Sequence, residues 1–462
     1  MRQIYGENKM GVMPVGRLLA NMATPIMISM LIQACYNIVD SIYVSQISEN
    51  ALTAVSMAFP VQNLMIGFST GVGVGMNSLL SKCLGSRDYD RANRAGGNGV
   101  FLSVVCCLLF VIGGALFSHD FFRFQSDIPE IVEGGTRYLT ICSVFSFGLF
   151  GAILCERLLQ ATGKTVYSMI TQTVGAVLNI VLDPLFIFGG LSIPAMGVSG
   201  AAVATVIGQI VSCILGLIFH FTLNKEVRLT LSGLLPNWQT LRPILSVGIP
   251  SVIMVAVGSV MTLSMNLILN GFTPTAVAVF GAYFKLQSFI FMPILGLNNA
   301  MVSIVAFNYG ARKPDRIKRT IVLSCGTALC FAVLGFLSFQ LAPDLLLGMF
   351  KPTPQFLEIG RTALRIIGWH YLLAGFCIVL NAVFQAMGNG LYATFTSLAR
   401  QLVVLLPVAF FLSLTGRLEL IWYAFPIAEV VSLLLSVLLF SRIYKKKILP
   451  LYDTQQESAA VR

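Results

Sequence analysis

Two distant stretches of the chain match each other: GSRDYDRANR (Gly85 to Arg94) and GARKPDRIKR (Gly310 to Arg319). They share five identities in ten positions, at an offset of 225 residues. The same offset aligns LLQATGKTVY (Leu158 to Tyr167) with VFQAMGNGLY (Val383 to Tyr392), with four further identities. Chance would give about one identity in such a window, so the chain is a tandem duplication.

The composition of this duplicated chain is typical of a membrane protein. Of its 462 residues, 56% are hydrophobic and only 11% are charged, which is about half the charged fraction of soluble domains. Apolar stretches of about 20 residues or more recur from end to end. We therefore predict an all-α membrane protein with twelve transmembrane helices, at about 17–44, 51–80, 95–118, 136–158, 164–189, 198–222, 241–268, 275–306, 320–341, 359–384, 391–414 and 420–441.

The distribution of charge predicts the orientation. When alternate loops are assigned to the same side, most of the 30 Lys and Arg residues fall on the side of both chain ends. This asymmetry follows the positive-inside rule and predicts a multi-pass protein of the cell membrane with both termini cytoplasmic. It also argues against nucleic acid as the reason for the net charge of +11. The run Lys445 to Lys447 is then a topological anchor, with contact to anionic membrane lipid as the alternative.

Six spans in each half is an even number, so the halves insert in the same orientation, as in parallel-repeat transporters. We expect two pseudo-symmetric six-helix bundles, with an N-terminal lobe at residues 1–220 and a C-terminal lobe at 241–447. The polar stretch 221–240 is the expected cytoplasmic linker between the lobes, and 448–462 is the expected polar tail.

Two acids stand well inside spans of the first half. An ionised carboxylate in a bilayer costs at least about 2.5–3.5 kcal/mol, so each one is a functional candidate. Tyr36 and Asn37 precede Asp40 by four and three residues, and Asn179 precedes Asp183 by four, so helical spacing puts each on the same face as its acid. Carboxylate, amide and phenol oxygens suit Na⁺ or a shared proton. The alternative is two independent acids that each satisfy a local backbone break.

The second half has a different set of polar residues. The positions that match Asp40 and Asp183 are Met265 and Val408, so the acid site is not repeated. Instead, three charged residues fall about ten residues into their spans: Lys285, Arg400 and Glu429. Arg400 and Glu429 lie on consecutive spans and are candidates for a pair, either structural or substrate-binding, which leaves Lys285 as a lone cation. His370, in span ten, is expected to be a core histidine with one backbone partner rather than a proton relay.

With these residues in place, the chain resembles the MATE (multidrug and toxic compound extrusion) family, part of a superfamily that includes oligosaccharide-lipid flippases. The resemblance covers the chain from Pro25 to about Lys447. It rests on the segments PIMISMLIQACYNIVDSIYV, AVSMAFPV, GVGVGMNSLLSKCLGSRD, LLQATGK, LDPLFIFG, GVSGAAVAT and FKLQSFIFMPILGLNNAMVSIVAFNYGARK. It implies two six-helix bundles that form a V around a central cavity.

The resemblance also implies a coupling site. One branch of the family uses an Asp on span one and an Asn-x-x-x-Asp on span five, which match Asp40, Asn179 and Asp183. Supporting residues in that branch match Tyr36, Tyr138 and Thr205 of this chain. Another branch carries acids on spans seven and ten, where this sequence offers only Glu358 at the start of span ten. The resemblance thus favours coupling in the N-terminal lobe, with Asp40, Asn179 and Asp183 as candidate ligands of Na⁺.

We therefore expect a secondary antiporter that exports amphipathic, cationic drugs or metabolites by alternating access, in exchange for Na⁺ or H⁺. A flippase for a lipid-linked saccharide or a related amphiphile is the alternative, although the cavity cations that would bind its pyrophosphate are few, chiefly Lys285 and Arg400. No motif of an intramembrane enzyme occurs in the sequence, so we expect no enzymatic activity and no cofactor. The expected partners are the small-molecule substrate and membrane lipid, and we expect the protein to be a monomer.

Overall fold

The computed structural model describes residues 8–190, 194–350 and 353–453, and almost all of its regular structure is helical. Ten helices are long and apolar enough to cross a membrane, and two bent pairs of shorter helices bring the number to twelve among the described residues. The predicted all-α, twelve-span fold is confirmed. Of the expected tail at 448–462, residues 454–462 lie outside the described ranges.

The chain divides into two compact units. Unit 1 is Met1–Val12 with Ile28–Val252, and unit 2 is Met13–Met27 with Ile253–Arg462. Two long helices belong to both units: α2 (Val15–Ser45) passes from unit 2 into unit 1, and α10 (Trp238–Asn270) passes from unit 1 into unit 2. The first half of each repeat's first helix is thus assigned to the unit of the other repeat.

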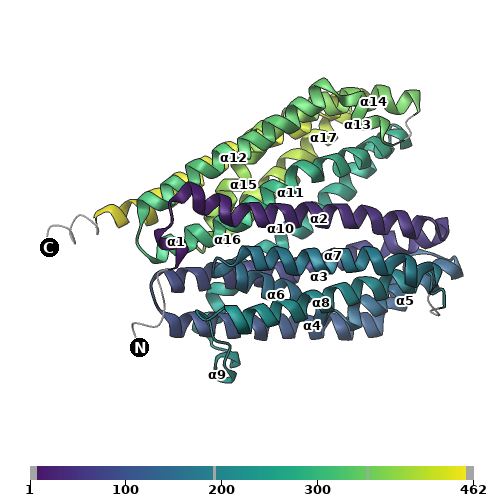
Figure 1. Ribbon diagram of the computed structural model, residues 1–462. Coiled ribbons are helices and arrows are strands. Elements are labelled where there is room, and N and C mark those ends of the chain that lie inside the picture. The colour runs from purple at the N-terminus through teal and green to yellow at the C-terminus, as the bar shows by residue number, and fades with distance from the viewer. Residues whose placement is uncertain (1–7, 191–193, 351–352, 454–462) are drawn as a thin grey trace, which may run out of the picture. The chain divides into compact units, whose positions relative to one another are not determined.

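Unit 1 also contains the helices that follow α2, whose long members run alongside one another (Figure 1). They are α3 (Glu49–Gly85), α4 (Tyr89–Gln125), α5 (Pro129–Val144), α6 (Phe147–Ala161), α7 (Thr165–Phe188) and α8 (Val198–Leu223), with the short α1 (Lys9–Val12) and α9 (Leu231–Leu234). Helices α5 and α6 are bent by 45° and make one span.

Unit 2 repeats this order after α10. Its helices are α11 (Pro274–Gly310), α12 (Pro314–Leu341), α13 (Pro343–Gly348), α14 (Pro354–Gly368), α15 (Tyr371–Ala386), α16 (Gly390–Leu398), η1 (Ala399–Leu405), α17 (Leu406–Ser413), α18 (Leu418–Ile421), α19 (Ala424–Ile443) and η2 (Tyr444–Ile448). The bent pair here is α14 with α15, at 50°. The two bends lie at equivalent places, because α5 ends at Val144 and α14 ends at Gly368.

The duplication is visible in the backbone as well as in the sequence. Arg87 and Arg312, which are 225 residues apart, are the two non-glycine residues with positive φ among those described, at 60° and 53°. Gly163 and Gly388, at the same offset, have φ of 78° and 74°. Left-handed conformations are uncommon outside glycine. Two such pairs at one offset show that the matching turns of both repeats have the same geometry.

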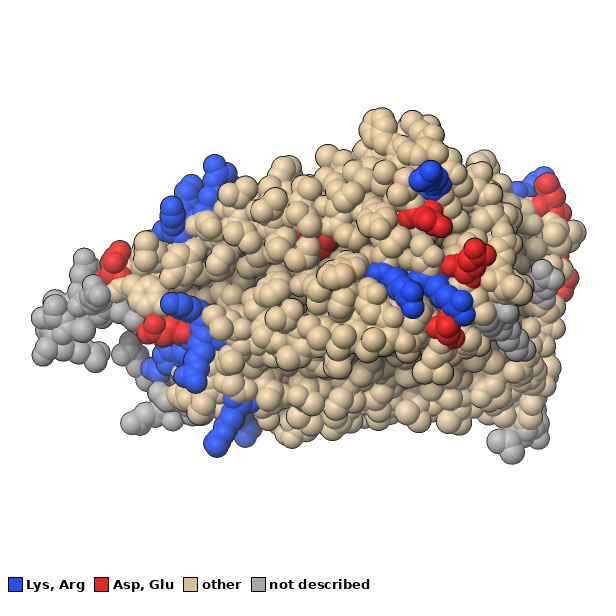
Figure 2. All heavy atoms as spheres, turned by 90° about the horizontal axis from the view of Figure 1, so that it is seen from above, with Lys and Arg blue, Asp and Glu red and all other residues tan. Residues whose placement is uncertain are grey.

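Most of the surface seen in Figure 2 is uncharged, with Lys, Arg, Asp and Glu confined to small groups. Many large apolar side chains are exposed along the spans, such as Leu109 on α4 and Leu267 on α10. In water such an apolar surface would promote aggregation, whereas in a bilayer it faces lipid tails. The exposed apolar residues therefore agree with a multi-pass membrane protein.

Candidate functional site

The structure brings the two predicted acids of unit 1 together. Asp40 lies on the second half of α2, and Asp183 lies on α7, where it is fully buried. Their carboxyl groups lie close enough to interact electrostatically and to hydrogen-bond when one of them carries a proton. A hydrogen bond between two carboxyl groups needs one proton, since two adjacent carboxylates would repel each other. This geometry is that of a pair of acids that can share a proton.

Asn179 connects this pair to α8. Its amide nitrogen lies 3.4 Å from Asp183 Oδ1 and 3.2 Å from Thr205 Oγ1. With the amide turned over, the nitrogen donates to Asp183 Oδ2 at 3.2 Å, and the oxygen accepts from the Thr205 backbone N–H at 3.1 Å. The turned orientation satisfies both ends of the amide, so it is the one that the hydrogen-bond network supports. Asn179 thereby holds the Asp183 carboxyl at a fixed place on α7.

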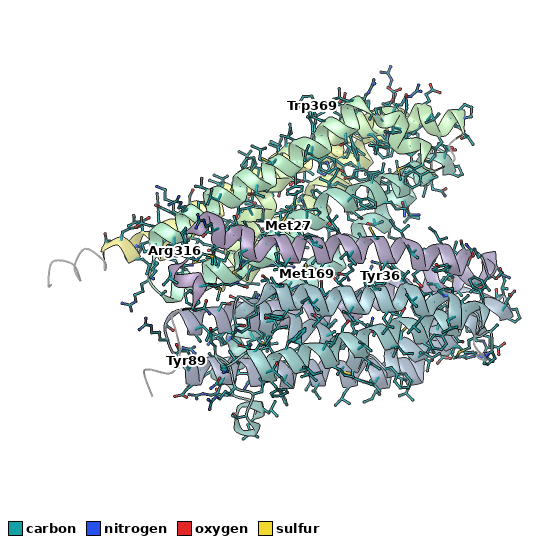
Figure 3. All side chains as sticks on the ribbon, in the orientation of Figure 1. Met27, Tyr36, Tyr89, Met169, Arg316 and Trp369 are labelled. Atoms are coloured by element: carbon teal, nitrogen blue, oxygen red, sulfur yellow. The ribbon has the colours of Figure 1, made fainter. Side chains whose placement is uncertain are left out.

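Two tyrosines complete the surroundings of Asp40. Tyr36, labelled in Figure 3 on the second half of α2, interacts electrostatically with both acids. Tyr138, on α5, is buried and lies within electrostatic reach of Asp40 and Tyr36. Its hydroxyl accepts a hydrogen bond from Gln62 Nε2 at 3.1 Å. Pairwise interactions therefore link all six residues predicted for this site into one polar cluster of unit 1, which we call the acid pocket: Tyr36, Asp40, Tyr138, Asn179, Asp183 and Thr205.

One carboxyl oxygen in the acid pocket is left without a hydrogen-bond partner in the part of the chain that the structure describes. Asp40 Oδ1 is buried and finds no hydrogen-bond partner among the described residues. An orphaned carboxyl oxygen in a low-dielectric site is costly unless a proton or a cation satisfies it. The described residues contain no group of three or more His, Cys, Asp or Glu side chains that could hold a metal. A Na⁺ ion here would therefore need amide, hydroxyl or water oxygens beside the two carboxylates.

Unit 2 holds a separate ion pair. Arg400 Nη1 lies 3.3 Å and 3.4 Å from the two carboxylate oxygens of Glu429. The Glu429 side chain is 4% exposed and that of Arg400 is 27% exposed, so the guanidinium keeps an open edge. Arg400 lies in η1, a π-helical segment, and such segments are frequent at functional sites.

Lys285 does not join this pair. Tyr283 on α11 lies within electrostatic reach of Glu429 and Arg400. Lys285 follows it by two residues, which is about 200° around the helix, and its side chain is exposed. The three charged residues predicted for the second half thus divide into a pair and a separate cation.

His370 is buried, with Nδ1 2.7 Å from the carbonyl oxygen of Ile367, as predicted for a core histidine.

Two parts of the polar interior of unit 1 had no role in the sequence prediction. Gln62 lies in the acid pocket, and its sequence signals are a polar side chain inside an apolar span and its identity with Gln287 at the 225-residue offset. Glu156 and Arg157, near the end of α6, are both buried. Gln160 Nε2 donates to Glu156 Oε1 at 2.6 Å, and Gln172 donates to Oε2. Because each carboxylate oxygen of Glu156 accepts a hydrogen bond from a glutamine, this acid has a structural role and is not a candidate ion-binding site.

Comparisons with known proteins bear on the fold and on the internal repeat. The MatE family model matches residues 25–185 and again residues 250–411, and the two matches begin 225 residues apart. The chain is 27% identical to "Probable multidrug resistance protein YoeA" of Bacillus subtilis, over 94% of this chain and 95% of the relative. It is 26% identical to the "FAD transporter" of Shewanella oneidensis, over 86% and 88%.

A solved structure supports the fold. A multidrug resistance MATE family transporter in an outward-facing conformation superposes with a TM-score of 0.90, at 24% identity, over 98% of this chain and all of that one. The family model alone covers more than half of the chain, in the two copies that the internal repeat predicts. The chain therefore belongs to the MatE family of membrane transporters.

Proposed function

We propose that the protein exports amphipathic small molecules across the cell membrane by alternating access, in exchange for Na⁺ or H⁺ bound in the acid pocket. The observation that carries the proposal is that the carboxyl groups of Asp40 and Asp183, on two different helices, lie within interaction distance of each other. A pair of acids in an apolar bundle can change its charge by one when a proton or Na⁺ arrives. The free energy of an ion gradient can then be used to favour one conformation.

The coupling needs differential binding. An ion shifts the equilibrium between inward-open and outward-open states only by its difference in affinity for the two, and equal affinity shifts nothing. Asp40 and Asp183 come from different helices, α2 and α7. A movement of α2 against α7 would change the distance between the carboxyl groups, and with it the affinity for the ion. A site on one helix alone would lack this sensitivity.

The experiment is dye efflux from everted membrane vesicles that contain the protein. An imposed Na⁺ gradient and an imposed proton gradient are applied separately, each in the direction that drives export. The proposal predicts that one of the two gradients drives accumulation of an amphipathic cationic dye, and that an ionophore for that ion abolishes it. Accumulation that is independent of both gradients would contradict ion-coupled antiport.

A second candidate substrate class is an anionic amphiphile. The open edge of the Arg400 guanidinium and the exposed Lys285 favour it, because both can pair with phosphate. The similarity to a protein named as an FAD transporter points the same way. The same vesicles distinguish the two classes: FAD uptake that is lost in Arg400→Gln supports the anionic class, whereas dye uptake without FAD uptake supports the cationic one.

A further inference from the structure

A basic cavity opens at one end of unit 1, far along the helices from the acid pocket. It has a volume of about 430 Å³ and lies where α4 and α10 begin. Tyr89, in the first turn of α4, marks this end of the unit in Figure 3. The charged and amide side chains that line it are those of Asp88, Arg91, Arg94, Asn237, Gln239 and Arg242.

One wall of the cavity is held in place by a buried asparagine. Asn98, on α4, is fully buried and donates to the carbonyl oxygens of Gly233 at 3.0 Å and Leu235 at 3.1 Å. Its own Oδ1 accepts from the backbone N–H of Asn237 at 2.9 Å. A Cβ atom on Gly97 would lie 2.2 Å from the Gly233 carbonyl oxygen. The stretch from Gly233 to Asn237 is therefore fixed tightly against α4, so the cavity has a defined wall.

The charge of the cavity is strongly positive. Three guanidinium groups face one carboxylate, and the Asp88 Oδ1 atom is occupied as the N-cap of α4, where it accepts from the backbone N–H of Arg91 at 3.0 Å. None of the three arginines forms an ion pair with any acid in the described parts of the chain. The start of α10 adds the positive end of a long helix dipole. An anion with several oxygens fits this set of donors.

The other repeat uses the equivalent positions differently. The residue that matches Arg91 is Arg316 (Figure 3), whose Nε donates to Asn308 Oδ1 at 2.9 Å and whose Nη2 donates to the Met13 carbonyl oxygen at 2.7 Å. Two nitrogens of the Arg316 guanidinium group are thus used in hydrogen bonds within the protein. The position that matches Asn98 is Leu323, so the wall of the cavity has no counterpart. The cavity is a feature of the first repeat and not a by-product of the duplication.

The rim of the cavity places the anion at the membrane surface. Trp238 is 67% exposed and Leu235 is 68% exposed, and both flank the lining residue Asn237. Trp at the end of a transmembrane helix lies at the level of the lipid headgroups, where basic residues meet phosphate. A free phosphate ion would have no use for exposed apolar side chains at the rim. We propose that this cavity binds the phosphodiester headgroup of an anionic phospholipid, and we call it the headgroup pocket.

The test is lipid titration of the full-length protein by native mass spectrometry, from a neutral detergent. Phosphatidylglycerol is compared with phosphatidylcholine in the wild type and in the triple variant Arg91→Gln, Arg94→Gln and Arg242→Gln. The wild type should prefer phosphatidylglycerol, and the triple variant should lose about 10- to 100-fold in affinity for it. The matched control Arg17→Gln, Lys318→Gln and Arg319→Gln removes the same charge from exposed positions of unit 2 and should keep the preference.

A second arm separates lipid from free phosphate. Trp238→Ala should weaken binding of phosphatidylglycerol, and inorganic phosphate at millimolar concentration should not displace the lipid. Equal binding of both lipids by the wild type, or an equal loss in the control triple variant, would overturn the site. Displacement by inorganic phosphate, together with unchanged lipid binding in Trp238→Ala, would overturn the lipid assignment and leave a site for free anions.

Discussion

Gly71 of α3 and Gly248 of α10 form one of the closest helix crossings in unit 1. A Cβ atom on Gly71 would lie 2.7 Å from the carbonyl oxygen of Gly248, and one on Gly248 would lie 3.0 Å from the carbonyl oxygen of Gly71. The equivalent crossing in unit 2 joins Gly296 of α11 to Met27 of α2 (Figure 3), at 2.7 Å from the Met27 Cα. Small residues at such crossings let transmembrane helices approach closely.

This crossing predicts a stability effect of Gly71→Ala. The added methyl group has backbone on one side and the Val252 side chain on the other, both at 2.7 Å, so the helices must separate. We expect a loss of about 1–3 kcal/mol, seen as a lower midpoint of thermal unfolding in detergent. Gly113→Ala on α4 is the control, because a Cβ atom there meets nothing within 4 Å. An unchanged midpoint in Gly71→Ala would show that the crossing is looser than described.

The orientation in the membrane is open to direct chemical test. Single cysteines are placed at Asp127, between α4 and α5, and at Ser86, between α3 and α4, after the exposed Cys35 and Cys330 have been replaced by Ser. With cytoplasmic termini, a membrane-impermeant maleimide added to intact cells should label the cysteine at 127 and leave the one at 86 unlabelled. Labelling only at 86 would reverse the orientation.

Glu429→Gln should affect stability more than coupling. The substitution leaves Arg400 without its partner in a largely buried place, and we expect a loss of about 1–3 kcal/mol. Thermal unfolding measures this loss, and vesicle efflux measures the coupling. Arg400→Gln combined with Glu429→Gln should regain part of the stability, since no unpaired charge remains. Loss of ion-driven efflux in folded Glu429→Gln would place the pair in the coupling machinery.

The sequence predicted the repeat, the twelve spans and the set of residues that meet in the acid pocket. The repeat and the spans have local signals, namely a constant offset and apolar length. Asp40 and Asp183 have polar groups one helical turn away, whereas Tyr138 and Thr205 were predicted only through the family resemblance. The break between α5 and α6 at Phe145 and Ser146 has no such signal, because no proline marks it. Nor do the roles of Gln62 and Asn98, whose partners are 76 and more than 130 residues away in the chain. The contacts of these two residues therefore appear only in the folded structure.

The N-terminal segment gives a prediction on pH. Asn8 Nδ2 donates to Glu226 Oε2 at 2.7 Å, and burial raises the pKa of Glu226, although Asn8 and Lys164 oppose the shift. Burial and, to a smaller extent, the positive charge of Lys164 lower the pKa of Lys9, the residue that follows Asn8. A raised carboxyl pKa in the folded state adds stability below the ordinary value of 4.5, and this contribution is lost as the pH rises through the folded value.

Glu226→Gln removes that dependence. The midpoint of thermal unfolding of the variant minus that of the wild type should increase from mildly acidic to neutral pH. At neutral pH the wild type buries a charged carboxylate, whereas the variant buries a neutral amide. The amide oxygen of the substituted side chain can still accept from Asn8. Glu419→Gln, at an exposed position, is the control and should show a constant difference. A difference for Glu226→Gln that does not vary with pH would contradict the assigned burial effect.

Ion coupling depends on Asp40 and Asp183, so the decisive measurement is gradient-driven efflux in Asp40→Asn and Asp183→Asn. Asn keeps the shape of the side chain and removes the shared proton and the charge. Both variants should fold and bind the dye, and both should lose ion-driven efflux, whereas the buried-acid control Glu156→Gln should keep its efflux wherever it folds. Ion-driven efflux at the wild-type rate in both Asp→Asn variants would contradict coupling through the acid pocket.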